Sequence, residues 1–140
     1  MTQATVVLAD FAEADANGKV HILGAGWSVT GPDPSPQAVV VFLKVPASQA
    51  GSPVAVALRL LDPSRNVVVI PGMSGPQPLE ISGQVIAKTP TEDWDTTRDL
   101  GASFVVNIAP LSLGPGSVYS WICEVDGKEV ASAEFLVRSG

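Results

Sequence analysis

Apolar residues recur at every second position through most of the sequence, and this period limits the folds open to the chain. In residues 79–87, for example, Leu79, Ile81 and Val85 alternate with polar side chains. This is the period of a strand with one buried face, whereas a helix repeats every 3.6 residues. Gly, Pro, Asn and Asp bound these segments, as they do in turns. We expect an all-β fold with about nine strands, at residues 4–9, 19–23, 38–45, 54–61, 67–70, 79–87, 103–109, 118–125 and 129–137.

The length of 140 residues is typical of one domain with one core. Gly and Pro cluster at residues 31–36 and 71–78, and both stretches have the length of ordinary loops rather than of domain linkers. We therefore predict a single β-sandwich over residues 1–140, either immunoglobulin-like or jelly-roll-like.

Two turns predict hairpins, because Asn17-Gly18 and Asp126-Gly127 are residue pairs that tolerate positive φ. The second turn sets the register of the strands that it joins. One face then carries Tyr119, Trp121, Cys123 and Val125, opposite a partner face with Ala131, Ala133, Phe135 and Val137. Bulky side chains are expected to oppose small ones.

One segment has the pattern of a short helix, near residues 90–100. Thr89 and Glu92 have capping-box spacing, a Pro stands at the first helical position, and Gly101 follows as a stop. We expect this helix to bridge two strands, with Trp94 fixing it to the rim of the sandwich.

Charge is sparse, and its distribution excludes several classes of partner. Charged residues make up 16% of the chain, and the net charge is −6. The cations are scattered singly along the sequence, so we expect no basic patch for nucleic acid and none for anionic lipid. The N-terminal apolar run is shorter than a signal-peptide core. The sequence predicts a soluble protein, cytoplasmic or assembled into a particle made in the cytoplasm.

Few residues are candidates for a catalytic or metal-binding role. His21 is the only histidine, and no nucleophile motif accompanies it, so we expect a structural strand histidine. Cys123 is the only cysteine, which excludes an internal disulfide and multi-cysteine zinc sites, and its strand parity predicts a buried, inert thiol. No enzyme activity and no cofactor are expected.

An acidic run is a weak candidate for calcium. Asp93, Asp95 and Asp99 lie close together in sequence, and hard cations prefer several carboxylates on a short loop. The spacing does not fit an EF-hand, because Arg98 and Phe104 stand where that loop needs Gly and Glu. A solvated helix start explains the acids more simply, so we expect no metal.

The strand at residues 38–45 has apolar residues on both faces. Val39, Val41 and Leu43 occupy one parity, and Val40 and Phe42 the other. Such a strand needs cover on both sides. Either a loop such as residues 24–36 or another subunit could cover the second face. Four residues are accordingly candidates for an interface: Val40, Phe42, Trp27 and Trp94.

Four stretches resemble an uncharacterised family of small bacterial and phage-associated proteins. They are Asp10-Phe-Ala-Glu, then Gly18-Lys-Val-His-Ile-Leu-Gly-Ala-Gly-Trp27 with the pattern G-K-x-x-I-L-G-x-G-W, then Pro115-Gly-Ser-Val-Tyr-Ser-Trp and Val125-Asp-Gly-Lys. The resemblance implies a compact β-sandwich and no known activity. Separately, Tyr119 after a tight turn is similar to the tyrosine corner of immunoglobulin-like sandwiches, whose hydroxyl bonds to upstream backbone.

These observations favour a non-enzymatic structural or interaction module. It would contribute a weakly charged β-sandwich surface to a homo-oligomer or a larger assembly. Such an assembly could be a phage or another particle, in which the chain serves as a decoration or accessory protein. The partner is then a protein or the chain itself. The alternative is a small-ligand or carbohydrate-binding domain that uses its end loops with Trp27 and Trp94, with calcium as an aid.

Overall fold

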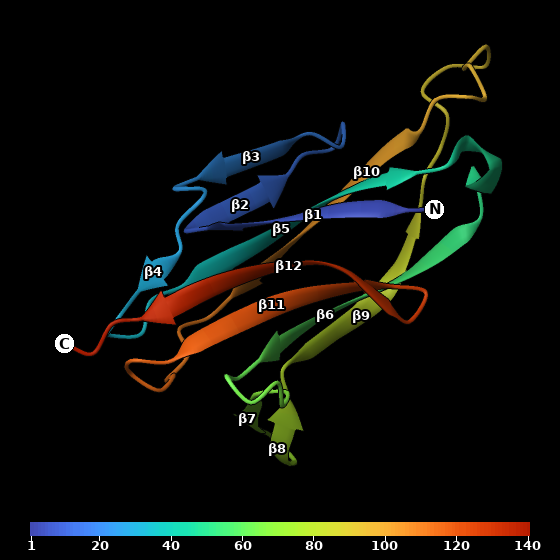
Figure 1. Ribbon diagram of the computed structural model, residues 1–140. Coiled ribbons are helices and arrows are strands. Elements are labelled where there is room, and N and C mark those ends of the chain that lie inside the picture. Colours follow the sequence, from blue (N-terminus) through green and yellow to red (C-terminus); the bar gives the residue numbers. More distant parts are fainter.

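The computed structural model describes all 140 residues, and its regular secondary structure is almost wholly β-strand (Figure 1). The strands are β1 (Gln3–Ala9), β2 (Phe11–Ala14), β3 (Val20–Leu23), β4 (Val29–Thr30), β5 (Gln37–Val45), β6 (Pro53–Leu61), β7 (Val69–Gly72), β8 (Gly75–Pro78), β9 (Glu80–Ile86), β10 (Leu100–Ile108), β11 (Val118–Val125) and β12 (Lys128–Val137). One turn of 3-10 helix, Ala47–Gln49, is the only helical element. The all-β prediction is confirmed.

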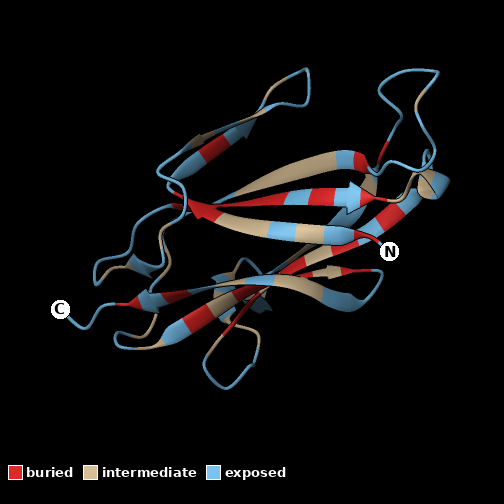
Figure 2. Cartoon of the chain, turned by 45° about the horizontal axis from the view of Figure 1, so that its top comes forward, coloured by how far each residue is buried: buried red, intermediate tan, exposed pale blue.

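Two sheets pack face to face. One has the order β1-β5-β10 and the other β4-β12-β11-β6-β9, and every neighbouring pair is antiparallel except β4 with β12. Figure 2 shows the buried residues concentrated between these layers. Two ribbons, β2–β3 and β7–β8, complete the fold. The ribbon β7–β8 corrects the prediction of a plain loop at residues 71–78.

The hairpin β11–β12 places the predicted residues on the shared face, although its register shifts by one residue between Cys123 and Glu124. Trp121 lies opposite Ala133, so a large side chain faces a small one there, whereas Cys123 and Ala131 are both small. Tyr119 is the exception, since it faces Phe135 and the two rings stack with centroids 5.9 Å apart. The inward parity is confirmed by burial, since Tyr119, Trp121, Cys123 and Phe135 are buried and the two alanines are half-buried.

The two predicted turns differ in detail. Asp126 and Gly127 have φ of 51° and 83°, so they form the expected two-residue turn. The hairpin β2–β3 also exists, but its loop runs over residues 15–19 and only Gly18 of the Asn-Gly pair has positive φ. The Asp15 carboxylate accepts the backbone N–H groups of Asn17 and Lys19 at 2.8 and 3.0 Å, which stabilises this longer loop.

The tyrosine corner is present. The backbone N–H of Gly114 donates to the hydroxyl oxygen of Tyr119 at 2.8 Å, and Gly114 lies five residues before this tyrosine in the chain. This bond fixes the entry of the chain into β11.

The helix predicted near residues 90–100 is wrong. The segment between β9 and β10 is an irregular loop with two turns, closed by bonds from Trp94 N–H to Thr91 O and from Arg98 N–H to Asp95 O. The Asp95 carboxylate accepts the backbone N–H and the hydroxyl of Thr97 at 2.9 and 2.7 Å. Asp and Thr side chains compete in this way with helical hydrogen bonding. Trp94 nevertheless packs against the main core, as expected of an anchor at the rim.

Both faces of β5 are covered, each by a different layer. Val39, Val41 and Leu43 belong to the main core, whereas Val40 lies in a second, small core beneath the β2–β3 ribbon. The cover is therefore internal, and it is this ribbon rather than residues 24–36. Val40 is 0% exposed, which removes it from the expected interface, whereas Phe42 is 40% exposed.

Two tryptophans allow a matched test of the core. The indole N–H of Trp121 donates to the buried Gln37 side chain at 2.9 Å, whereas that of Trp27 is buried with no acceptor. Trp121→Phe should cost about 2–4 kcal/mol of unfolding free energy, because it leaves Gln37 unsatisfied and opens a cavity. Trp27→Phe removes an unsatisfied donor, so its cost should stay within about 1 kcal/mol. Urea unfolding measures both, and equal losses would contradict this account.

Candidate interaction surface

His21 has no catalytic surroundings. Its side chain is 68% exposed on β3, and its Nε2 lies 3.0 Å from Asp15 Oδ2, its only side-chain partner. This hydrogen bond lowers the pKa of Asp15. No hydroxyl or thiol nucleophile bonds to the ring, so the pair lacks the third member that a hydrolase would need.

The three aspartates considered for calcium do not form a site. The structure contains no group of three or more His, Cys, Asp or Glu side chains able to hold a metal ion. The Asp95 carboxylate accepts a hydrogen bond from the backbone N–H of Thr97, and this bond lowers the pKa of the carboxyl group. Asp93, Asp95 and Asp99 are exposed on the loop between β9 and β10.

Trp27 and Trp94 do not form a shared aromatic platform. Trp27 packs edge-on against Phe135, with ring centroids 5.5 Å apart. The Trp94 ring is covered by the Arg98 guanidinium at 4.9 Å, and its N–H donates to Arg98 O. Arg98 therefore occupies one face of the Trp94 ring, and Trp27 is anchored to the core through Phe135.

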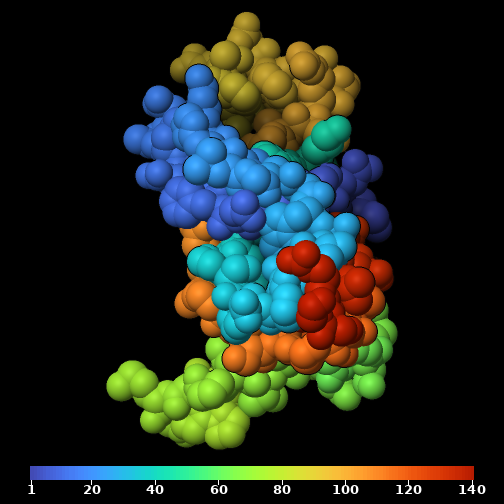
Figure 3. Space-filling view, turned by 90° about the vertical axis from the view of Figure 1, so that its left-hand side faces the viewer, coloured from blue at the N-terminus to red at the C-terminus, as the bar shows by residue number.

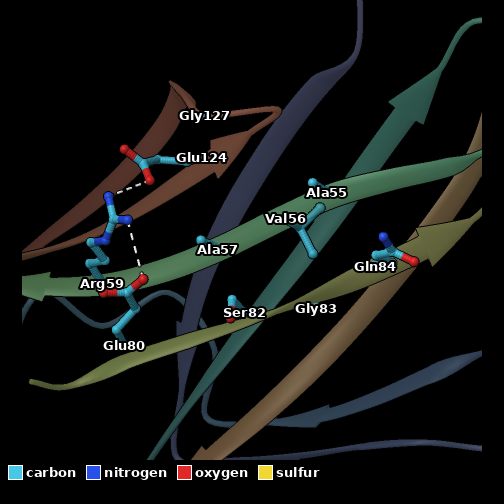
Figure 4. Close-up of a pocket in the computed structure, with 10 residues that line it drawn as sticks. All are labelled: Ala55, Val56, Ala57, Arg59, Glu80, Ser82, Gly83, Gln84, Glu124 and Gly127. Carbon is cyan, nitrogen blue, oxygen red and sulfur yellow. Dashed lines mark hydrogen bonds and ion pairs between the residues drawn. The ribbon is translucent and has the colours of Figure 1, made fainter. Parts of the chain in front are cut away.

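A charged cluster lies on the outer face of the larger sheet (Figure 4). Arg59 on β6 pairs with Glu80 on β9 at 3.2 Å and with Glu124 on β11. The hydrogen bond with Glu80 raises the pKa of Arg59. A shallow hollow of about 370 Å³ adjoins the cluster. Since one cation is shared by two carboxylates, this cluster ties three strands together and leaves no free cation.

The sandwich is closed on one side and open on the other. On the closed side β1 packs beside β12. On the open side β10 pairs only with β5, and β9 only with β6, so each has one free edge. Figure 3 shows the loop between β9 and β10 and the β7–β8 ribbon projecting at opposite ends of the molecule.

A cleft of about 1080 Å³ lies at this open side. Its walls come from the tip of the β2–β3 ribbon and from β5, the end of β9 and the start of β10. It is lined by Asn17, Gly18, Lys19, Val20, Phe42, Leu43, Lys44, Val85, Ile86, Ala87, Lys88, Gly101, Ala102 and Ser103. Phe42 and Ile86 are 40% and 51% exposed, so two large apolar side chains face solvent here.

The cleft also corrects the expectation that the cations stay scattered. Three of the eight Lys and Arg residues, Lys19, Lys44 and Lys88, line it together, and no acid does. They are far apart in the sequence and no local motif marks them, because only the ribbon and the register of β5 bring them together. Ile86 was not predicted as an interface residue for the same reason, whereas Phe42 was predicted from its position on the second apolar face of its strand.

A family model described as a family of unknown function (DUF6941) matches residues 4–138. The chain belongs to this family. No curated protein and no solved structure matches this DUF6941 chain. The structure also contains no helix long and apolar enough to cross a membrane.

Cys123 should react only after unfolding. It is fully buried on β11, and this burial raises the pKa of its thiol, which disfavours the reactive thiolate. Under native conditions at pH 8 we expect labelling by a thiol-specific disulfide reagent to be at least about 10³-fold slower than in denaturant. Comparable rates in both conditions would contradict the buried position.

Calcium should not stabilise the protein. Since the three aspartates do not converge, calcium has no site specific to the folded state and gives no stabilisation by mass action. The melting temperature is expected to be the same in millimolar calcium and in EDTA. A calcium-dependent rise that Asp95→Asn removes would overturn this conclusion.

Proposed function

We propose that this protein is a non-enzymatic structural module that associates with copies of itself through the open side of the sandwich. The observation that carries the proposal is the cleft beside the free edges of β9 and β10, with Phe42 and Ile86 exposed at its walls. Exposed apolar side chains gathered next to unpaired strand edges are typical of a surface that another protein covers.

The composition of the open side supports a protein contact. The centres of protein interfaces are depleted in charge and enriched in aromatic residues. Apart from its three lysines, the cleft is lined by apolar, small and amide side chains, with Phe42 as its aromatic residue. The lysines give its walls a charge opposite to the net charge of −6 of the whole chain.

The remaining candidates for chemistry have structural roles, which also supports this proposal. His21 pairs with Asp15, Arg59 bridges two glutamates, and Cys123 is buried in the core. We further propose that the assembly is a larger particle made in the cytoplasm, in which this chain is an accessory or decoration protein. The low charge and the resemblance to phage-associated proteins support that setting, and virion genes beside this one would test it.

The test of self-association is the molar mass in solution, measured by size exclusion with light scattering over a dilution series. The wild type should exceed the monomer mass at high concentration and approach it on dilution. Phe42→Ser with Ile86→Ser should weaken association at least about tenfold, because it removes apolar area from the contact.

The matched control is Leu23→Ser with Val69→Ser, which alters two exposed apolar side chains outside the cleft. This control should associate like the wild type. A wild type that remains a monomer at every concentration would overturn the proposed function.

A further inference from the structure

The free edge of β10 lacks the features that normally protect an exposed strand edge. Its nine residues, Leu-Gly-Ala-Ser-Phe-Val-Val-Asn-Ile, include no charge and no Pro. It pairs with β5 over its whole length without a bulge. No backbone–backbone hydrogen bond joins it to any element other than β5. The β2–β3 ribbon contacts β10 on its outer face, where the Asn107 side chain bonds to the backbone of Ala12. Natural proteins usually guard such edges with Lys, Pro, bulges or a covering segment.

The other edges of the two packed sheets are protected. β1 packs beside β12, and β4 is only two residues long and precedes Pro32. β9 has Gly83 at its centre, Glu80 at one end and Lys88 just beyond the other, and Gly and charge both weaken strand pairing. β10 is therefore the edge best suited to receive another strand.

We propose that two copies of the chain pair β10 against β10, antiparallel and about a two-fold axis near Phe104, so that the two small sheets become one sheet of six strands. This inference rests on the proposed function and specifies its interface. A two-fold contact uses the same patch on both copies, as a strand paired with itself does.

The side chains of β10 suit this pairing. On one side of Phe104 lie the small residues Gly101, Ala102 and Ser103, and on the other the larger Val105, Val106 and Asn107. Antiparallel pairing about Phe104 places Val105 opposite Ser103 and Val106 opposite Ala102, so that large meets small. The hairpin β11–β12 has the same arrangement at Trp121 with Ala133.

The pairing also accounts for the exposure of Phe42. Phe42 lies beside Ser103 in the register of β5 with β10, on the outer face of the sheet. In the dimer the next residue in this row is Val105 of the second copy. Phe42 and that valine then flank the small Ser103 from both sides, so the second copy covers apolar surface that is open in one chain.

The absence of charge explains why a second copy can occupy this edge. Each chain carries a net charge of −6, so two copies repel over most of their surfaces. Along β10 no side chain is charged, and close contact there creates no like-charge pair.

Hydrogen exchange at low and high protein concentration tests this interface. Amides on the free edge of β10 should exchange quickly in the monomer and become protected in the dimer, because they gain hydrogen-bond partners. Within residues 100–108, we expect concentration-dependent protection of the alternate amides that point away from β5, and unchanged exchange in residues 80–86. Association that protects β9 or only the cleft walls, and leaves β10 unchanged, would overturn this inference but not the proposed function.

A pair of lysine substitutions provides an independent arm. Ser103→Lys places a cation on the outer face of the edge strand β10, beside Phe42, and Ser82→Lys makes the same change on the outer face of β9. Ser103→Lys should weaken dimerisation at least about tenfold, while Ser82→Lys should leave it unchanged. The β10–β10 pairing would be overturned if both substitutions weakened dimerisation equally, or if Ser103→Lys did not weaken it. A strictly monomeric wild type would instead overturn the proposed function itself.

Discussion

The need to cover both faces of β5 determines much of this structure. The large sheet covers one face, and the β2–β3 ribbon covers the other above Val40. The Asn107 side chain holds this ribbon through the backbone of Ala12, donating at 2.8 Å and accepting at 3.3 Å. At the base of the ribbon, Gly24 has φ of +65°, and a Cβ there would lie 2.2 Å from Asp10 Oδ2. Glycine is therefore required where the chain folds back over the sheet.

The same ribbon creates the candidate interaction surface. It is held near Asn107, so it covers that half of the small sheet and leaves Phe42 and Ser103 only partly covered at the other end. Its tip, with Lys19, becomes one wall of the cleft, while Lys44 and Lys88 come from β5 and the residues after β9. A covering element that is shorter than the face beneath it thus produces the exposed apolar surface and the group of lysines together.

The sequence predicted what depends on alternation and turns, and failed where side chains compete with the backbone. Residues 118–125 were predicted with the observed bounds because their parity is regular and an Asp-Gly turn marks the end of the strand. The register shift between Cys123 and Glu124 was not predicted, because the turn alone sets only the pairs next to it. The helix near residues 90–100 failed because Asp95 bonds to Thr97 instead of supporting a helix. The β7–β8 ribbon was missed because its prolines indicated a loop, although a ribbon with two free edges tolerates residues that donate no hydrogen bond. The cleft could not be predicted, because its lysines meet only through tertiary packing.

The lack of charged residues along β10 affects whether association stops at two copies. If β10 paired with β9 of the next molecule, the contact would join different surfaces, leave a free edge at each end and continue as a filament. Glu80, Gly83 and Lys88 make β9 a poor partner for such growth. Pairing of β10 with β10 uses the unguarded edge of both copies at once and leaves no unguarded edge in the packed sheets. The net charge of −6 on each copy opposes further contacts elsewhere. A single unguarded edge on a molecule with a net charge of −6 therefore favours a closed dimer over open-ended assembly, and larger structures would have to form through other surfaces.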